Sequence, residues 1–180
     1  MSKSDKLLIL DLDETLIFAT ERSLNLHEDF KFGSYFVYKR PYLDEFLNEV
    51  SSKFTLGVWS SASDDYVSGI AKLIVPAHIN LFITWGRSKC TLRRNSVYDT
   101  LYFEKRLGKI KNKGFGLEKI LLVDDTPEKA RSNYGNAVYL KEFKGDKSDN
   151  ELPDLCKYLI SIMDVENVRV IEKRNWKTQI

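Results

Sequence analysis

The feature of the sequence that most constrains the fold is a short apolar run, Leu7–Leu10, followed at once by two aspartates, Asp11 and Asp13. Four consecutive apolar residues are typical of a strand buried on both faces, and such strands lie in the middle of sheets in α/β proteins. Ligands of these sheets bind beyond the carboxyl ends of the strands. We therefore expect Asp11 and Asp13 to lie where the chemistry takes place.

The spacing of the two aspartates favours a particular chemistry. In an extended chain, residues two apart send their side chains to the same face. Two neighbouring carboxylates repel each other when both are ionised, and Mg²⁺, which prefers hard oxygen ligands, removes that cost. One carboxylate can then attack phosphorus while the other gives a proton to the leaving oxygen. The alternative is structural, since such a pair can also cap the turn at residues 13–15.

Length and charge limit the other possibilities. A chain of 180 residues predicts a single domain, residues 1–180, with a substantial core. The net charge of +2 gives no field strong enough to make nucleic acid or an anionic membrane the main partner. We expect no leader, because the first residues are polar, and no apolar run is long enough for a membrane helix. Cys90 and Cys156 have neither metal-site nor disulfide-framework spacing, so we expect an intracellular protein, cytoplasmic or nuclear.

Strand and helix patterns alternate along the chain. After the first strand, further strands are predicted at 54–59, 81–85, 119–123 and 137–140. Helices are predicted from Arg40-Pro41, from Asp64-Asp65, from Thr126-Pro127 with Thr126 as N-cap, and over 151–163. Residues 30–38 predict an aromatic hairpin, and residues 86–99 predict a polar excursion from the sheet. Residues 102–109 could form a helix or a loop. The tail after residue 163 could be helical or frayed. The alternation predicts an α/β fold around a mainly parallel sheet.

Four positions near predicted strand ends carry groups that phosphoryl transfer needs. They are Asp11 with Asp13, Ser60, Lys105, and the pair Asp124 and Asp125. Catalysis of phosphoryl transfer depends on positioning and charge stabilisation, because the transition state spreads negative charge over the phosphoryl oxygens. A hydroxyl and a lysine can stabilise that charge, and a second acid pair can complete the ligands of a metal ion or orient its waters.

Five motifs, in order along the chain, resemble those of a known family. Asp11-Leu-Asp13-Glu-Thr15 is similar to the Asp-x-Asp-x-Thr signature of the haloacid dehalogenase superfamily. The other motifs narrow the resemblance to the carboxy-terminal-domain phosphatases, also called NLI-interacting-factor-like; they are Arg40-Pro41-x-x-x-Glu45-Phe-Leu47, Trp59-Ser60, Lys105-x-Leu107 and Val123-Asp124-Asp125-x-Pro127. The resemblance covers nearly the whole chain. It implies a Rossmann-like fold with small β insertions and no large cap domain.

The resemblance also implies roles for these residues. Asp11 would be the nucleophile, and Asp13 the general acid and then the general base. Mg²⁺ would be held by Asp11, by the Asp13 backbone carbonyl and by the second acid pair, usually Asp125 with Asp124 close behind. Ser60 and Lys105 would hold the phosphate, and Thr15 would brace the loop after the nucleophile.

Two assignments stay open. The family often has threonine where this chain has Ser60, and Ser61 follows it, so either serine could bind phosphate. Lys109 is an alternative to Lys105, because either lysine alone could lie on a solvated helix face.

The gaps between these motifs bear on the substrate. Neither the gap from Asp11 to Ser60 nor that from Ser60 to Lys105 can hold an extra helical domain, so we expect no large lid. An open cleft suits a phosphate carried on serine or threonine of a protein or peptide. The hairpin at 30–38 and the excursion at 86–99 could form its walls, or they could be core aromatics and a solvated loop. We expect this enzyme to be a monomer.

Three rival functions remain. A phosphatase for nucleic-acid ends is slightly favoured by Arg93-Arg94 and the lysines of 105–113, though not by the net charge. A receiver-type signalling domain uses similar groups, but it places the acid pair first and the accepting aspartate mid-chain. A catalytically silent binding module is the third, although the acids needed for catalysis are present.

Overall fold

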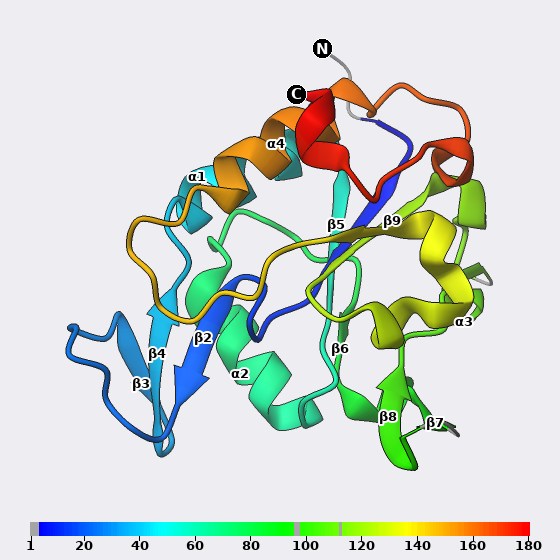
Figure 1. Ribbon diagram of the computed structural model, residues 1–180. Helices are drawn as coiled ribbons and strands as arrows, with labels where there is room; N and C mark the ends of the chain where they lie inside the picture. Colours follow the sequence, from blue (N-terminus) through cyan, green and yellow to red (C-terminus); the bar gives the residue numbers. More distant parts are fainter. Residues whose placement is uncertain (1–3, 96–97, 112) are drawn as a thin grey trace.

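Figure 1 shows the computed structural model, which describes residues 4–95, 98–111 and 113–180. Its centre is a parallel five-stranded sheet of order β10-β9-β1-β5-β6. The strands are β1 (Leu7–Leu10), β5 (Thr55–Trp59), β6 (Thr84–Trp85), β9 (Ile120–Asp124) and β10 (Ala137–Tyr139). The predicted α/β fold with a buried first strand is confirmed, since all four residues of β1 are buried between β5 and β9.

The two faces of the sheet are covered by different structures. Leu8 and Leu10 of β1 face a cluster that includes the apolar stripes of the α-helices, while Leu7 and Ile9 face a second cluster. The helices of the first layer are α1 (Leu43–Lys53), α2 (Asp64–Ile74) and α4 (Glu151–Ser161). The second layer contains α3 (Gly108–Lys111) and the 3-10 segments η2 (Leu117–Lys119) and η3 (Pro127–Asn136). Burial of alternate residues on both faces explains why β1 is apolar throughout.

Two small antiparallel sheets flank the central sheet (Figure 1). The first contains β3 (Phe30–Phe32) and β4 (Tyr35–Lys39), which confirm the predicted aromatic hairpin, and β2 (Ile17–Thr20) pairs with the other edge of β4. The second pairs β7 (Thr91–Asn95) with β8 (Thr100–Glu104). Between β6 and β7 lies η1 (Arg87–Lys89). The predicted excursion, residues 86–99, therefore contains η1 and the first strand of the β7–β8 hairpin. Residues 96 and 97 lie outside the described ranges.

The predicted helix after Thr126 begins at Pro127 as expected, but it is not a regular α-helix and the Thr126 side chain does not cap it. Pro127–Asn136 is 3-10 helix, broken by non-helical dihedral angles at Ala130 and Asn133, and the Thr126 side chain makes no capping hydrogen bond. The Thr126 hydroxyl instead donates to Asp125 at 2.8 Å. Asn133 and Asn136 are buried and donate to backbone carbonyls of neighbouring segments, which holds the chain in this irregular path. The predicted strand at 81–85 is also shorter than expected, because only Thr84–Trp85 pairs with β5.

The end of the chain lies along β10, the edge strand of the sheet. It contains η4 (Val168–Val170) and η5 (Trp176–Gln179). Trp176 is 3% exposed and donates from its indole N–H to the Tyr139 carbonyl at 2.9 Å. The tail is therefore neither a regular helix nor frayed. In the described part of the chain, every helix is too short or too polar to cross a bilayer.

Candidate active site

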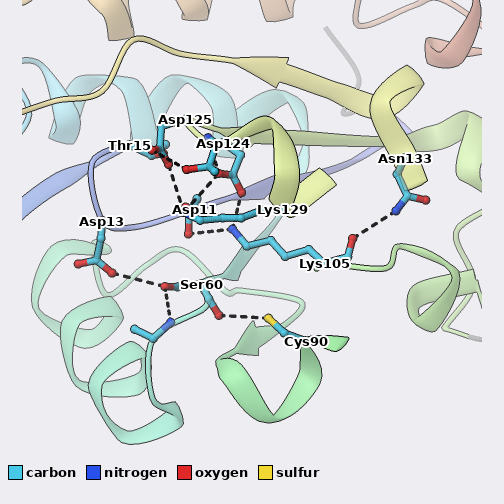
Figure 2. A network of polar contacts seen from close by, with 12 residues as sticks. Asp11, Asp13, Thr15, Ser60, Cys90, Lys105, Asp124, Asp125, Lys129 and Asn133 are labelled. Atoms are coloured by element: carbon cyan, nitrogen blue, oxygen red, sulfur yellow. Dashed lines mark hydrogen bonds and ion pairs between the residues drawn. The ribbon is translucent and has the colours of Figure 1, made fainter. Parts of the chain in front are cut away.

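The predicted site residues converge at the carboxyl edge of the sheet. Asp11 follows β1, Ser60 follows β5 and Asp124 ends β9, so three adjacent parallel strands deliver them to one place. Lys105 enters from the end of β8 (Figure 2). This convergence is the general consequence of parallel strands ending at one edge.

Three of the acids form a tight cluster. One carboxylate oxygen each of Asp11, Asp124 and Asp125 lies within 4.8 Å of the others. Asp11 and Asp124 are fully buried. Among the described residues, Oδ1 of Asp11 accepts no hydrogen bond of good geometry, although the Lys105 ammonium lies 2.8 Å away as an ion-pair partner. Three hard carboxylates gathered at one point fit a divalent cation such as Mg²⁺.

Lys105 is buried against this cluster. Its Nζ lies 2.8 Å from Oδ1 of Asp11 and 2.6 Å from Oδ2 of Asp124. Its backbone is fastened to η3, because the Lys105 N–H donates to the Lys129 carbonyl and the Asn133 amide donates to the Lys105 carbonyl. Lys109, the alternative, lies elsewhere, since its ammonium donates to the carbonyls of Lys89 and Cys90.

A second lysine, Lys129 of η3, also contacts the acid cluster, and it was not identified from the sequence. Its Nζ lies 2.9 Å from Asp11, 3.3 Å from Asp125 and 3.5 Å from Asp124. Burial alone would lower the pKa of the Lys129 ammonium, but the surrounding carboxylates raise that pKa above its ordinary value. The one local signal was its position four residues after Asp125.

The two fully buried acids titrate in opposite directions. Burial acts to raise the pKa of Asp11, yet the ammonium groups of Lys105 and Lys129 lower it to about 2. The pKa of Asp124 is raised, first by burial and then by the negative charge of Asp11. Asp11 is therefore the acid that stays ionised, as a carboxylate nucleophile must.

The Asp13 side chain lies apart from the cluster and points toward Ser60 (Figure 2). Its Oδ1 accepts a hydrogen bond from the Tyr66 hydroxyl at 2.6 Å and its Oδ2 one from Ser60 at 3.4 Å. Burial raises the pKa of Asp13 above its ordinary value. A carboxyl with a raised pKa is suited to proton donation. Tyr66, which lies on α2, was not identified from the sequence as a contact of Asp13.

The remaining predicted residues take different positions. The Ser60 hydroxyl, besides its bond to Asp13, accepts from the Ala62 N–H. Ser61 contributes its carbonyl to Arg87. Thr15 is buried and donates to Asp125 at 3.5 Å, so its observed contact is with the acid cluster.

The loop after Asp11 is fastened by Arg40, from the Arg-Pro motif. Arg40 donates to the Thr15 carbonyl at 2.9 Å and the Lys141 carbonyl at 2.9 Å. It also makes a two-pronged ion pair with Asp149, with both N···O distances 2.8 Å. Its side chain is fully buried. The site is thus braced from behind by a guanidinium that touches none of the clustered acids.

An open cleft of about 440 Å³ borders the site on the Asp13 side. Among its lining residues are Asp13, Tyr35, Tyr66 and Arg87. A larger hollow of about 720 Å³ lies between α1 and α4, and none of the clustered acids lines it. Tyr35 comes from the aromatic hairpin, which therefore forms one wall of the cleft beside Asp13.

The family model described as "NLI interacting factor-like phosphatase" matches residues 6–169. Nuclear envelope morphology protein 1 of Saccharomyces cerevisiae is 26% identical over 190 residues, covering 95% of this chain and 43% of that protein. A probable C-terminal domain small phosphatase of Dictyostelium discoideum is 28% identical over 180 residues, covering 94% and 55%. The chain thus spans about half the length of these relatives.

Solved structures show the same fold. The RNA polymerase II CTD phosphatase Fcp1 of fission yeast, bound to beryllium fluoride, superposes with a TM-score of 0.58 at 19% identity. The match covers 97% of this chain and 54% of that one. It confirms the predicted haloacid dehalogenase-like architecture.

Proposed function

This chain belongs to the NLI interacting factor-like phosphatase family, and on that premise we propose that it is a Mg²⁺-dependent phosphatase acting through an aspartyl-phosphate. The observation that carries the proposal is the buried cluster of Asp11, Asp124 and Asp125 at the carboxyl edge of the sheet. Lys105, paired with two of these acids, supplies positive charge at the same place. All 180 residues would act as one phosphatase domain.

The reaction divides between two aspartates. The ionised carboxylate of Asp11 attacks phosphorus, and the bond from phosphorus to the substrate oxygen breaks. The carboxyl group of Asp13 gives its proton to that leaving oxygen. The Asp13 carboxylate then takes a proton from a water molecule as this water attacks the aspartyl-phosphate, which releases phosphate and restores Asp11.

Other residues hold the phosphoryl group and the ion. Mg²⁺, when bound, neutralises negative charge on the phosphoryl oxygens. Asp11, Asp124 and Asp125 would hold it, together with the Asp13 backbone carbonyl that the family motif implies. Lys105 and the Ser60 hydroxyl would bind phosphoryl oxygens, with Ser61 as the alternative hydroxyl. Thr15 would brace the loop through its contact with Asp125.

The substrate we propose is a protein or peptide phosphorylated on serine or threonine. The cleft beside Asp13 is open, and its aromatic and basic lining, Tyr35, Tyr66 and Arg87, could contact a chain that carries the phosphate. Several relatives are named as C-terminal-domain phosphatases. We expect the enzyme to work as a monomer in the cytoplasm or nucleus, without membrane or nucleic acid as its main partner.

An activity on nucleic-acid ends is less favoured. Arg93 pairs with Glu104 at 2.9 Å, and Arg94 pairs with Asp99 at 2.5 Å. These two acids offset the charge of the two arginines that favoured an oligonucleotide partner.

The test is hydrolysis of a chromogenic phosphate ester with and without Mg²⁺, beside a panel of phosphoserine peptides, sugar phosphates and nucleotides. We expect activity that EDTA removes, and higher kcat/KM for the peptides. Faster turnover of free metabolites would overturn the substrate class. Activity that survives both EDTA and Asp11→Asn would overturn the mechanism.

A further inference from the structure

Lys129 has no role in the chemistry above, yet its ammonium is directed into the centre of the acid cluster. It lies 2.9–3.5 Å from one oxygen of each of the three clustered aspartates. Lys105 contacts two of these acids, Asp11 and Asp124, through different oxygens from those that Lys129 contacts. Lys129 is therefore the lysine that bridges the complete set of acids expected to bind the ion.

An ammonium and a metal ion cannot share this position. Mg²⁺ binds carboxylate oxygens at about 2.1 Å, so an ion held by these three acids would lie in the space that Nζ of Lys129 occupies. Two cations a few ångströms apart in a buried site also repel each other strongly. One of them has to leave before the other binds.

The two lysines differ in their freedom to leave. The Lys105 side chain is fully buried, whereas the Lys129 side chain is 17% exposed. The Lys129 backbone is held, because its carbonyl accepts from the Lys105 N–H and its N–H donates to the Thr126 carbonyl. Only the flexible four-carbon stem would have to swing toward solvent, and the fold would stay in place.

We propose that Lys129 is a built-in competitor of Mg²⁺: its ammonium holds the three carboxylates together when the ion is absent and is displaced when the ion binds. This inference rests on the proposed function, since it concerns the same ion. In both states the acids are compensated by positive charge. Because Mg²⁺ has to displace the ammonium, Lys129 lowers the affinity of the site for Mg²⁺ and so raises the Mg²⁺ concentration at which the site fills.

The test is a calorimetric Mg²⁺ titration of the full chain and of Lys129→Met, which keeps the length of the stem and removes the charge. We expect Mg²⁺ to bind the variant about tenfold more tightly or better, because the displacement cost is gone. We also expect its Tm to be lower than that of wild type without Mg²⁺ and to rise more when Mg²⁺ is added. Lys129→Arg, which keeps a cation, should stay near wild-type affinity. Lys72→Met, on the exposed face of α2, controls for the loss of one positive charge.

The outcomes separate this inference from the proposed function. Mg²⁺ binding to wild type with equal or weaker affinity for Lys129→Met would overturn the competitor role and leave the metal site standing. Absence of Mg²⁺ binding by both proteins would overturn both. If Lys129→Met fails to fold, the wild-type protein decides the matter through the NMR signal of the Lys129 ε-methylene. That signal should shift as Mg²⁺ is added, and an unchanged signal at saturating Mg²⁺ would refute displacement.

Discussion

Two buried ionic groups lie on either side of the loop that follows Asp11, and they are built differently. Arg40 makes four hydrogen bonds, two to the oxygens of Asp149 and two to the carbonyls of Thr15 and Lys141. In the acid cluster, three carboxylates share the ammonium groups of Lys105 and Lys129, so negative groups outnumber the positive groups that contact them.

The contrast extends to the titration of the acids. Asp149 has a lowered pKa: burial is the largest effect and raises it, but the hydrogen bonds from Arg40 and the Glu151 N–H, together with the charges of Arg40 and Lys177, outweigh burial. Asp124, equally close to a cation, has a raised pKa, because burial and the charge of Asp11 outweigh Lys105. A saturated ion pair stabilises the fold, whereas an unsaturated one keeps capacity for a ligand. The following experiments test whether this division holds, from the largest expected effect to the smallest.

Asp11→Asn should lower kcat for phosphate-ester hydrolysis by at least about ten-thousandfold, because the amide cannot attack phosphorus. The fold should survive, since the change also relieves the repulsion between Asp11 and Asp124. Activity and Tm are measured on the same preparation. If this variant unfolds as readily as an Arg40 variant, the cluster is structural as well and the contrast fails.

Arg40→Leu should lower the free energy of unfolding by about 3–5 kcal/mol, because it leaves the Asp149 carboxylate and two carbonyls without their donor. Arg40→Lys, which keeps the charge and loses the two-pronged geometry, should show an intermediate loss. Urea unfolding with and without Mg²⁺ gives the measurement. The deficit should be the same in both conditions; a deficit that Mg²⁺ abolishes would mean that Arg40 acts through the ion.

Asp125→Asn should weaken Mg²⁺ binding by about 10- to 100-fold, since it removes one charged ligand of the ion. Its effect on stability without Mg²⁺ should be modest: Thr15 and Thr126 donate to different oxygens of Asp125, so the amide oxygen keeps one of these bonds, and the other hydroxyl can instead accept from the amide N–H. Calorimetry measures the affinity. Ser161→Ala, at the end of α4 and far from the cluster, is the matched control and should bind Mg²⁺ as wild type does.

Asp149→Asn should lower stability at neutral pH by about 1 kcal/mol, and the size of the loss should depend on pH. The folded pKa of Asp149 lies below its ordinary value of 3.8, so its ionised form contributes stability above pH 3.8. That contribution is lost as the pH falls through the folded pKa. Unfolding curves from pH 7 to pH 2.5 should therefore show a constant difference between variant and wild type above about pH 5, which narrows below pH 4. A difference that grows in acid would contradict the assignment.

The same division explains what the sequence could reveal. Runs of apolar residues that end in acids are local patterns, so the strands and Asp11, Asp124 and Asp125 could be predicted with their place at the sheet edge. The partners of these residues could not. Arg40 and Asp149 are 109 positions apart, and Tyr66 reaches Asp13 from a different element, so their contacts leave no periodic trace.

The irregular segment after Thr126 shows a second limit. Its Thr-Pro start is typical of a helix, but buried asparagines bound to distant carbonyls override that local preference. Lys129 lies on this segment, four residues after Asp125, and that spacing could have identified it as a partner of Asp125. Such a prediction would have assumed a regular α-helix, however, and the segment is 3-10 helix.

The way the chain end lies along β10 has a consequence for handling this protein. Residues 169–174 lie beside residues 134–139, and the Trp176 indole N–H donates a hydrogen bond to the Tyr139 carbonyl at the outer edge of β10. A protein shortened before residue 168 would leave that edge bare, and unpaired strand edges recruit other strands. Proteolytic trimming of the last dozen residues would also remove the buried Trp176, so we expect the trimmed protein to associate through this edge, as size-exclusion chromatography would show.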